Sequence, residues 1–182
     1  MVRAPGTIDL GKYRVVYEEE RQPAAEKTDG YLLQQRAIIR LNEPLVKLEC
    51  ADDTTVLCDD KPFKAATGKR PSPLQYFIAS IGFCMFSQLT RFASRLGVPI
   101  EDFEMDLRMT YDLSGRFSLR DISAATRGLS YILKIKSPAP VERVMRVAQL
   151  TDKSCHTVNS MRKRAPVNGT MVLNDRQYEI RD

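Results

Sequence analysis

The sequence contains a single histidine, His156, no tryptophan, and four cysteines that stand far apart along the chain. A structural zinc site needs about four cysteine or histidine ligands, usually in close pairs such as C-x-x-C. His156 adjoins Cys155, but adjacent residues of a helix point about 100° apart and hold one metal ion poorly. We therefore expect no metal site and no cofactor.

Motifs of several large enzyme classes are also missing. Thr67-Gly68-Lys69 lacks the earlier glycine of a phosphate-binding P-loop. The sequence has no Gly-x-Ser-x-Gly motif, and a serine–histidine–acid triad would have to use His156. These absences argue against nucleotide-dependent and serine-hydrolase chemistry and leave the thiols as candidates.

Charge of one sign is not concentrated in any long run. The 182 residues carry a net charge of +5, with 28% charged and 43% apolar residues. The densest basic runs, Lys69-Arg70 and Arg162-Lys163-Arg164, are too short to indicate nucleic acid. The opening MVRAPGTIDLGKYR has no apolar run, so we predict no signal peptide and a cytoplasmic protein, in which cysteines are rarely joined as structural disulfides.

One long segment, PSPLQYFIASIGFCMFSQLT, has no charge at all. Its glutamines, serines and prolines favour a buried helix over a membrane span. Ser72 and Pro73 are typical of a helix start, and Gly97 followed by Pro99 predicts its end. Apolar residues occur on both faces of the first half of this helix, so one small sheet cannot cover it.

The remaining pattern predicts an α+β protein. Alternation predicts strands at Tyr13–Tyr17, 37–39, 46–50 and 54–58, with a polar loop over Glu20–Gly30. After the helix it predicts strands at Phe103–Tyr111, Leu129–Ile135, Met171–Leu173 and Tyr178–Ile180, with short helices near 141–148 and 154–164. This order predicts one domain over residues 1–182, comprising a strand-rich lobe over 1–66 and a helix with an α+β part over 67–182.

The cysteines differ in their settings. Cys50 and Cys58 flank a predicted hairpin at apolar positions and are interpreted as small buried hydrophobes. Cys84 lies at the edge of the apolar stripe of the long helix, either as a structural or as a functional thiol. Cys155 lies near a helix start beside Lys153 and His156, a setting that favours a thiolate, although a surface cysteine without a role fits as well.

Three segments, taken in order, resemble the OsmC/Ohr family of osmotically inducible and organic-hydroperoxide-resistance proteins. They are GKRPSPLQYFIASIGFC, LGVPIEDFEMDLRMTYDL and PVERVMRVAQLTDKSCHTV, within about Gly68 to Leu173. The resemblance implies an OsmC-like fold with antiparallel sheets around a long central helix. It also implies an intertwined homodimer with active sites at the subunit interface, whose partner chain would cover the second apolar face of the helix.

The resemblance further implies an antioxidant role in oxidative stress. Cys84 matches the peroxidatic cysteine and Cys155 the resolving cysteine, with an organic hydroperoxide as substrate and an external dithiol as reductant. The expected substrate pocket consists of Leu74, Gln75, Phe77, Ile81, Phe83 and Phe86.

One position departs from the peroxidase branch, which carries a glutamate directly after the helix-opening proline to orient an arginine over the thiolate. This sequence has Leu74 there, followed by Gln75, and Arg36 and Arg40 are the candidate arginines. The alternative is therefore a non-peroxidase OsmC-like dimer that binds an apolar or acyl ligand at the subunit interface.

Overall fold

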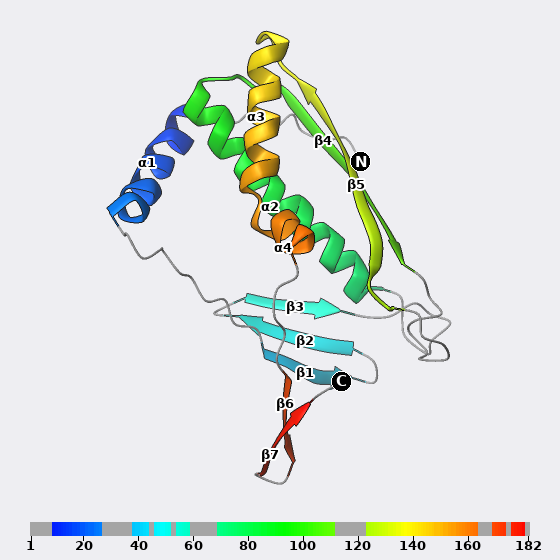
Figure 1. Cartoon of the computed structure of the whole chain (residues 1–182). Helices are drawn as coiled ribbons and strands as arrows, with labels where there is room; N and C mark the ends of the chain where they lie inside the picture. Colours follow the sequence, from blue (N-terminus) through cyan, green and yellow to red (C-terminus); the bar gives the residue numbers. More distant parts are fainter. Residues whose placement is uncertain are drawn as a thin grey trace.

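The computed structural model describes residues 9–26, 38–43, 46–51, 54–58, 69–111, 123–163, 169–173 and 176–180. The elements follow in the order α1 (Leu10–Glu26), β1 (Ile38–Glu43), β2 (Val46–Ala51), β3 (Thr54–Cys58), α2 (Pro73–Leu96), β4 (Asp102–Tyr111), β5 (Thr126–Lys136), α3 (Val141–Ser154), α4 (His156–Arg162), β6 (Gly169–Leu173) and β7 (Arg176–Ile180). The strands form three antiparallel sheets, ordered β1-β2-β3, β4-β5 and β6-β7. In Figure 1, α2 runs through the centre and packs against α1, α3, α4 and β4. The predicted α+β class, with antiparallel sheets and a long helix, is confirmed.

Helix α2 begins and ends where its sequence predicts. The Ser72 hydroxyl accepts a hydrogen bond from the Gln75 N–H at 3.4 Å, and the Gln75 side chain accepts one from the Ser72 N–H at 2.8 Å, which completes a capping box. At the other end Gly97 adopts φ 60°, a left-handed conformation that favours glycine. Arg143 of α3 donates to the carbonyls of Leu96 at 2.6 Å and Gly97 at 3.2 Å. Helix α3 thereby helps to satisfy the last carbonyls of α2.

The core is divided into two clusters along α2. The C-terminal cluster consists of Leu89, Phe92, Ala93, Val98, Ile100 and Val147. The cysteine cluster consists of Ile81, Met85, Cys155 and Val158, and apolar residues of β4 and β5 pack against it. Strand β4 comes so close to α2 that a Cβ atom added at Gly82 would lie 3.2 Å from Leu107 Cδ1. The predicted alternation of β4 thus supplies one cover for the first half of α2.

Part of the surface of α2 lies open within the single chain. Four of its large apolar side chains, which point to different sides of the helix, are substantially exposed: Leu74 at 48%, Phe77 at 45%, Phe83 at 71% and Phe86 at 40%. The sequence predicted that one small sheet could not cover both faces of this helix. These exposures agree with that expectation.

The N-terminal part corrects the sequence-based prediction. Residues Tyr13–Tyr17 were expected to form a strand and Glu20–Gly30 a loop, but α1 extends over Leu10–Glu26. Three alternating residues are too short a pattern to distinguish strand from helix. The helix gains i,i+3 and i,i+4 contacts, such as Arg21 to Glu18 at 3.3 Å, and a tertiary contact in which Ser94 Oγ donates to the Leu10 carbonyl at 2.6 Å.

The predicted strands after α1 are present in the described part of the chain. Strand β2 pairs with β3 so that Cys50 faces Thr55 and Lys47 faces Cys58. Tyr76 of α2 donates to the Leu57 carbonyl at 2.8 Å, which ties this sheet to the start of the long helix. The C-terminal strands β6 and β7 pair antiparallel, as predicted.

Candidate thiol site

Cys84 and Cys155 meet in the cysteine cluster, although they come from distant segments. Cys84 lies midway along α2 and is half-buried, whereas Cys155 lies between α3 and α4 and is fully buried. The Cys155 side chain is within hydrogen-bonding reach of the Cys84 thiol. No disulfide joins them. The structure therefore brings together the two thiols that the sequence singled out.

The first turn of α4 surrounds Cys84 with hydrogen-bond donors. Burial raises the pKa of the Cys84 thiol, but hydrogen bonds from the Thr157 N–H, the Cys155 thiol, the Thr157 hydroxyl and the His156 N–H lower it, and they prevail. Donors to a thiolate favour its charged form over the neutral thiol. Cys84 is consequently the more acidic partner of the pair.

Cys155 has the opposite character. Burial is the main cause that raises the pKa of its thiol, and the neighbouring Cys84 raises it further. Its sulfur lies 3.2 Å from Thr157 Oγ1. The sequence offered either a reactive thiolate favoured by the start of α4 or a surface cysteine. Cys155 does lie at the start of α4, but the surface interpretation is wrong, because the residue is fully buried. Its raised pKa does not favour the thiolate.

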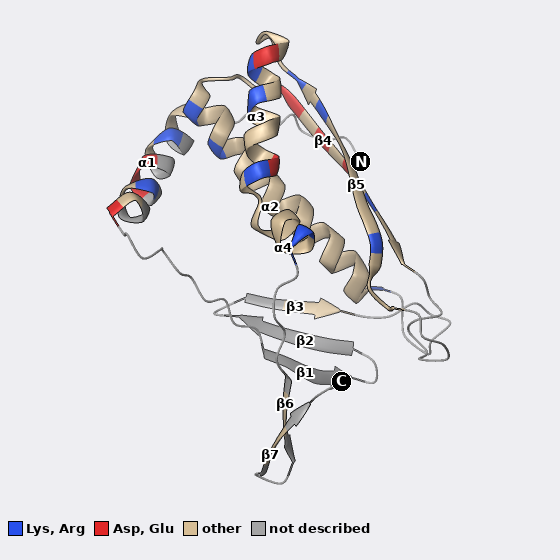
Figure 2. Cartoon of the chain, in the orientation of Figure 1, with Lys and Arg blue, Asp and Glu red and all other residues tan. Residues whose placement is uncertain are grey.

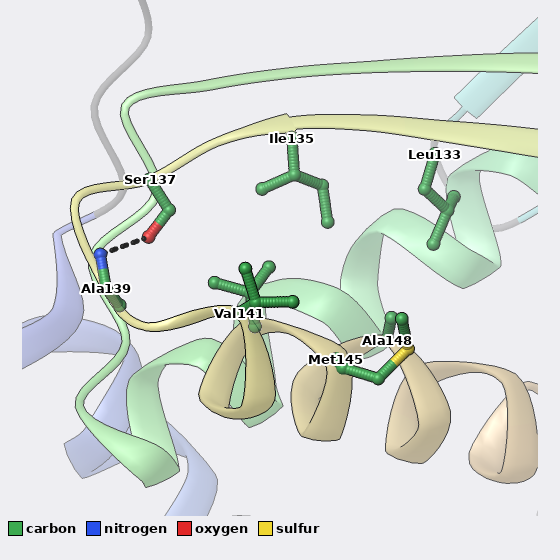
Figure 3. A pocket seen from close by; sticks show the side chains of 8 residues that line it. Leu133, Ile135, Ser137, Ala139, Val141, Met145 and Ala148 are labelled. Atoms are coloured by element: carbon green, nitrogen blue, oxygen red, sulfur yellow. Dashed lines mark hydrogen bonds between the residues drawn. The ribbon is translucent and has the colours of Figure 1, made fainter.

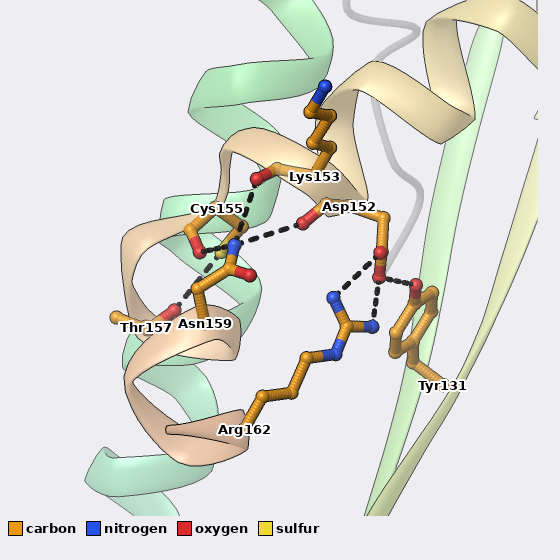
Figure 4. A network of polar contacts seen from close by, with 7 residues as sticks. All are labelled: Tyr131, Asp152, Lys153, Cys155, Thr157, Asn159 and Arg162. Atoms are coloured by element: carbon orange, nitrogen blue, oxygen red, sulfur yellow. Dashed lines mark hydrogen bonds and ion pairs between the residues drawn. The ribbon is translucent and has the colours of Figure 1, made fainter. Parts of the chain in front are cut away.

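The break between α3 and α4 is held by Asn159. Its side-chain amide donates to three backbone carbonyls, those of Asp152 at 3.3 Å, Lys153 at 3.0 Å and Cys155 at 2.7 Å (Figure 4). Because these carbonyls end α3, the amide fixes the angle at which α4 leaves it. That angle directs the His156 and Thr157 N–H groups toward Cys84.

A second set of contacts fastens α4 to β5. Arg162 binds the Asp152 carboxylate through two hydrogen bonds of 2.8 Å, and the Tyr131 hydroxyl of β5 donates to the same carboxylate (Figure 4). The hydrogen bond from Arg162 holds the pKa of Asp152 below its usual value. Burial, together with Asp152, raises the pKa of Tyr131 to about 12. Asp152 is thus a carboxylate, and Tyr131 a neutral donor, throughout the physiological range.

Thr157, Asn159 and the Tyr131–Asp152–Arg162 contacts were not predicted from the sequence. Asn159 carried a partial signal, since asparagine inside a short helix often binds nearby backbone groups. The others join positions on three different elements, and no spacing along the chain relates them.

The other predicted site residues have different settings. Gln75 belongs to the capping box of α2, and Ile81 is fully buried in the cysteine cluster beside Cys155. Leu74, Phe77, Phe83 and Phe86 are exposed side chains on different sides of α2. Of the candidate arginines, Arg36 lies outside the described residues. Arg40 pairs with Leu48 in β1, and its side chain is not described, as is also the case for Cys50 in β2.

The described donors to Cys84 come from Thr157, Cys155 and His156, and none of these is an arginine. Within the described ranges, no group of three or more histidine, cysteine or acidic residues is arranged to hold a metal ion. The described helices include none with the length and apolar character needed to span a membrane.

An apolar groove of about 370 Å³ lies away from the thiols, between β5 and α3 (Figure 3). Leu133 and Ile135 form one wall, and Val141, Met145 and Ala148 form the other. Val141 and Met145 are more than half exposed. The groove contains no thiol or charged side chain among its described lining residues.

The chain is similar to a family of known proteins. The model of the family described as OsmC-like protein matches residues 66–169, more than half of the chain. No curated protein matches the chain.

Several solved structures share the fold. An OsmC-like protein from Mycoplasma pneumoniae superposes with a TM-score of 0.64 at 16% identity, over 74% of this chain and 91% of that chain. The organic hydroperoxide resistance protein OhrB of Bacillus subtilis gives a TM-score of 0.51 at 16% identity, over 74% and 94%. An organic hydroperoxide resistance protein from Elizabethkingia anophelis gives 0.53 at 12% identity, over 74% and 91%. At these identities the likeness establishes the fold alone.

Proposed function

The chain belongs to the OsmC-like protein family, and from this premise we propose that it reduces organic hydroperoxides, with Cys84 as the attacking thiolate and Cys155 as the resolving thiol. One observation supports the proposal. Cys84 packs against the cluster that contains Cys155, and the pKa of the Cys84 thiol is lowered whereas that of Cys155 is raised. Organic hydroperoxide resistance proteins with the same fold support the choice of substrate class.

The chemistry follows from the lowered pKa of Cys84 and the raised pKa of Cys155. The Cys84 thiolate attacks the distal oxygen of the hydroperoxide, the O–O bond breaks, and the alkoxide leaves as an alcohol after taking a proton. Cys84 becomes a sulfenic acid. The Cys155 sulfur then attacks the Cys84 sulfur, its proton leaves with the departing hydroxide as water, and a Cys84–Cys155 disulfide results. An external dithiol reduces that disulfide and regenerates both thiols.

In this proposal, the hydrogen-bond donors at the start of α4 activate Cys84 by stabilising its thiolate. The N–H groups of His156 and Thr157 and the Thr157 hydroxyl are fixed before the peroxide arrives, since Asn159 and Asp152 hold the turn. Fixed donors favour the thiolate without having to reorganise during the reaction. Among the described residues, they serve in place of the glutamate-oriented arginine expected from the peroxidase branch. The position of that glutamate, directly after the proline, is occupied here by Leu74.

We also propose that the protein acts as a homodimer whose interface contains exposed apolar side chains of α2. Phe77, Phe83 and Phe86 remain substantially exposed in the single chain. Burying a phenylalanine side chain contributes about 1.5–3 kcal/mol, so a second copy that covers these side chains would be strongly favoured. The apolar rings would then line the approach to Cys84 and suit an organic peroxide better than hydrogen peroxide.

A second candidate function is favoured by two observations. No arginine is among the described donors to Cys84, and Leu74 stands, 48% exposed, where the peroxidase branch carries its glutamate. A dimer that binds an apolar or acyl ligand at this interface, without peroxide chemistry, would fit both. Native mass spectrometry of the purified protein would then show a co-purified ligand, and peroxide turnover would be absent.

The decisive test is peroxide consumption with cumene hydroperoxide and excess dithiothreitol. We expect turnover by the wild type, no turnover by Cys84→Ser, and a Cys84–Cys155 disulfide in wild-type protein oxidised with one equivalent of peroxide. Cys155→Ser should instead accumulate a sulfenic acid at Cys84 that reacts with dimedone. Cys58→Ser is the matched control, since Cys58 lies in β3, outside the cysteine cluster. Equal turnover by wild type and Cys84→Ser would refute the proposal.

A further inference from the structure

A second pocket, of about 620 Å³, is lined by residues of all four helices and borders Cys155. Four of its described lining residues are basic: Arg21 of α1, Arg91 of α2, Lys153 of α3 and Lys163 directly after α4. Figure 2 shows lysine and arginine positions in blue on each of these helices. None of the described lining residues is acidic, and none is a valine, leucine, isoleucine, methionine or phenylalanine. The pocket is therefore positively charged and, unlike the groove between β5 and α3, has no hydrocarbon wall among its described residues.

The positive charge of this pocket is only partly neutralised. Arg21 forms an exposed ion pair with Glu18 of the same helix at 3.3 Å. Lys153 and Lys163, in contrast, have no acidic partner within 4 Å among the residues that the structure describes. Asp152 is next to Lys153 in sequence, but its carboxylate is already bound by an arginine and a tyrosine. The two lysines are therefore available to an anion.

The wall of the pocket also contains a buried amide. Gln88 of α2 is only 6% exposed and lines the pocket, and its side chain makes no hydrogen bond within the described part of the chain. A buried amide is costly to leave without a partner. The oxygens of a phosphate or carboxylate group would accept hydrogen bonds from this amide as well as from the lysines. The amide is thus an indication of a ligand that is independent of the charge.

These features define a chemical class of ligand. Lysine and arginine bind both phosphate and carboxylate groups, and four of them around one pocket can neutralise more than one such group. The volume is in the range of pockets that bind small molecules, but the described wall offers no hydrocarbon side chain to an acyl chain or an aromatic ring. We propose that this pocket binds a small hydrophilic polyanion that carries two or more phosphate or carboxylate groups. The inference goes beyond the proposed function, because binding involves no redox step.

The occupant of this pocket would join α1 to the turn between α3 and α4. Near its start α1 is held by Leu10, which packs against the C-terminal cluster and whose carbonyl accepts a hydrogen bond from Ser94 at 2.6 Å. Arg21 lies in the second half of α1, and the ion pair described for it is with its own helix. A polyanion bound by Arg21 together with the two lysines bridges α1 to the α3–α4 segment. Ligand binding is thereby coupled to how firmly α1 is held.

Pyrophosphate and citrate test the proposal, since both are compact polyanions and one carries phosphate groups whereas the other carries carboxylates. His156 is the only histidine of the sequence and lines the pocket, so its imidazole NMR signal reports occupancy without overlap. In untagged, reduced protein at low ionic strength, we expect at least one of the two anions to shift this signal saturably, with a dissociation constant of about 1 mM or below. The anion that binds more tightly identifies the preferred group. A shift that sodium chloride reproduces at equal ionic strength would overturn the proposal.

Two double variants separate the pocket from the net charge of the protein. Lys153→Gln/Lys163→Gln should raise the dissociation constant at least about tenfold, because it removes both unpaired cations of the pocket. Arg14→Gln/Arg146→Gln removes two exposed charges outside the pocket and should leave the dissociation constant within about twofold of the wild-type value. Equal weakening by the two double variants would contradict a site in this pocket.

Gln88→Met tests the buried amide at nearly constant side-chain volume. We expect the dissociation constant to rise at least about threefold, without a loss of stability in urea, because the native amide has no hydrogen-bond partner to lose. Lower stability with unchanged affinity would show that the amide supports the fold and not a ligand.

Hydrogen exchange tests the effect on α1. At a saturating concentration of the tighter anion, the amides of the second half of α1 should exchange at least about threefold more slowly in the wild type, and at an unchanged rate in Lys153→Gln/Lys163→Gln. Unchanged exchange in the wild type at saturation would overturn the bridge to α1. None of these measurements uses peroxide, so their outcome is independent of whether the thiol pair reduces hydroperoxides.

Discussion

Thr157 is linked to both thiols of the pair: its hydroxyl oxygen lies 3.2 Å from the sulfur of Cys155, and its N–H and hydroxyl lower the pKa of Cys84. The residue thereby links the two thiols through one rigid turn of α4. In the described part of the chain, the hydrogen-bond donors of this turn stabilise the Cys84 thiolate, as a nearby cation does for many reactive cysteines.

Replacing Thr157 by valine removes the hydroxyl and leaves the N–H in place. A hydrogen bond to a charged group contributes about 1.5–3 kcal/mol, and one pH unit corresponds to about 1.4 kcal/mol. We expect the pKa of Cys84 to rise by about one pH unit, and the rate of peroxide attack at neutral pH to fall accordingly. The rate of alkylation of Cys84 by iodoacetamide as a function of pH, followed by peptide mass spectrometry, measures this change. Thr157→Ser keeps the hydroxyl and should behave like the wild type, and an unchanged pH midpoint in Thr157→Val would contradict the role assigned to the hydroxyl.

We expect Asn159 to affect both the free energy of unfolding and the pKa of the Cys84 thiol. Asn159→Ala removes the side-chain hydrogen bonds to three carbonyls between α3 and α4, at a cost of about 1–2 kcal/mol in the free energy of unfolding. The loosened turn should also raise the pKa of Cys84. Urea denaturation and the alkylation assay report the two effects. Ser160→Ala, at an exposed position of the same helix, is the control and should change neither. Loss of stability with an unaltered Cys84 pKa would show that Asn159 does not position the donors.

Most of the fold could be predicted from local sequence features. Ser72, Gln75 and Gly97 set the ends of α2 through contacts within a few residues, and the alternation of β4 is likewise local. Helix α1 could not be predicted in this way, because it is defined in part by the contact between Ser94 and Leu10. The meeting of Cys84 with Cys155 was implied by family resemblance, but the donation from Thr157 to Cys84 depends on how α4 meets α2. The spacing of apolar residues in either helix does not reveal how α4 packs against α2.

The Asp152 carboxylate predicts a dependence of stability on pH. Its folded pKa is lowered, mainly by the hydrogen bond from Arg162, so its contribution is present above the unfolded pKa near 3.8 and is lost as the pH falls through the folded value. Asp152→Asn should therefore lower the free energy of unfolding at pH 7 by about 1–2 kcal/mol, and by less near pH 3. Urea denaturation at the two pH values provides the measurement. Asp106→Asn breaks an exposed pair with Arg108 and should have little effect. A deficit of equal size at both pH values would show that Asp152 acts through packing and not through its charge.

The exposed surface of α2 around Phe83 is where we expect a second copy of the chain to bind. Phe83 is 71% exposed in the single chain, so Phe83→Glu places a charge in solvent and leaves the fold of the monomer intact, whereas in a dimer it would place that charge in the interface. A two-fold interface contains the residue twice, and each buried phenylalanine contributes about 1.5–3 kcal/mol. The dissociation constant should therefore rise at least about 100-fold, as measured by sedimentation velocity over a range of concentrations. Val141→Glu changes a residue of similar exposure, 73%, at the start of α3 and should leave the dimer unchanged. If Phe83→Glu keeps the wild-type dissociation constant, the second copy does not sit on this face, and the apolar approach to Cys84 has to be completed by another part of the same chain.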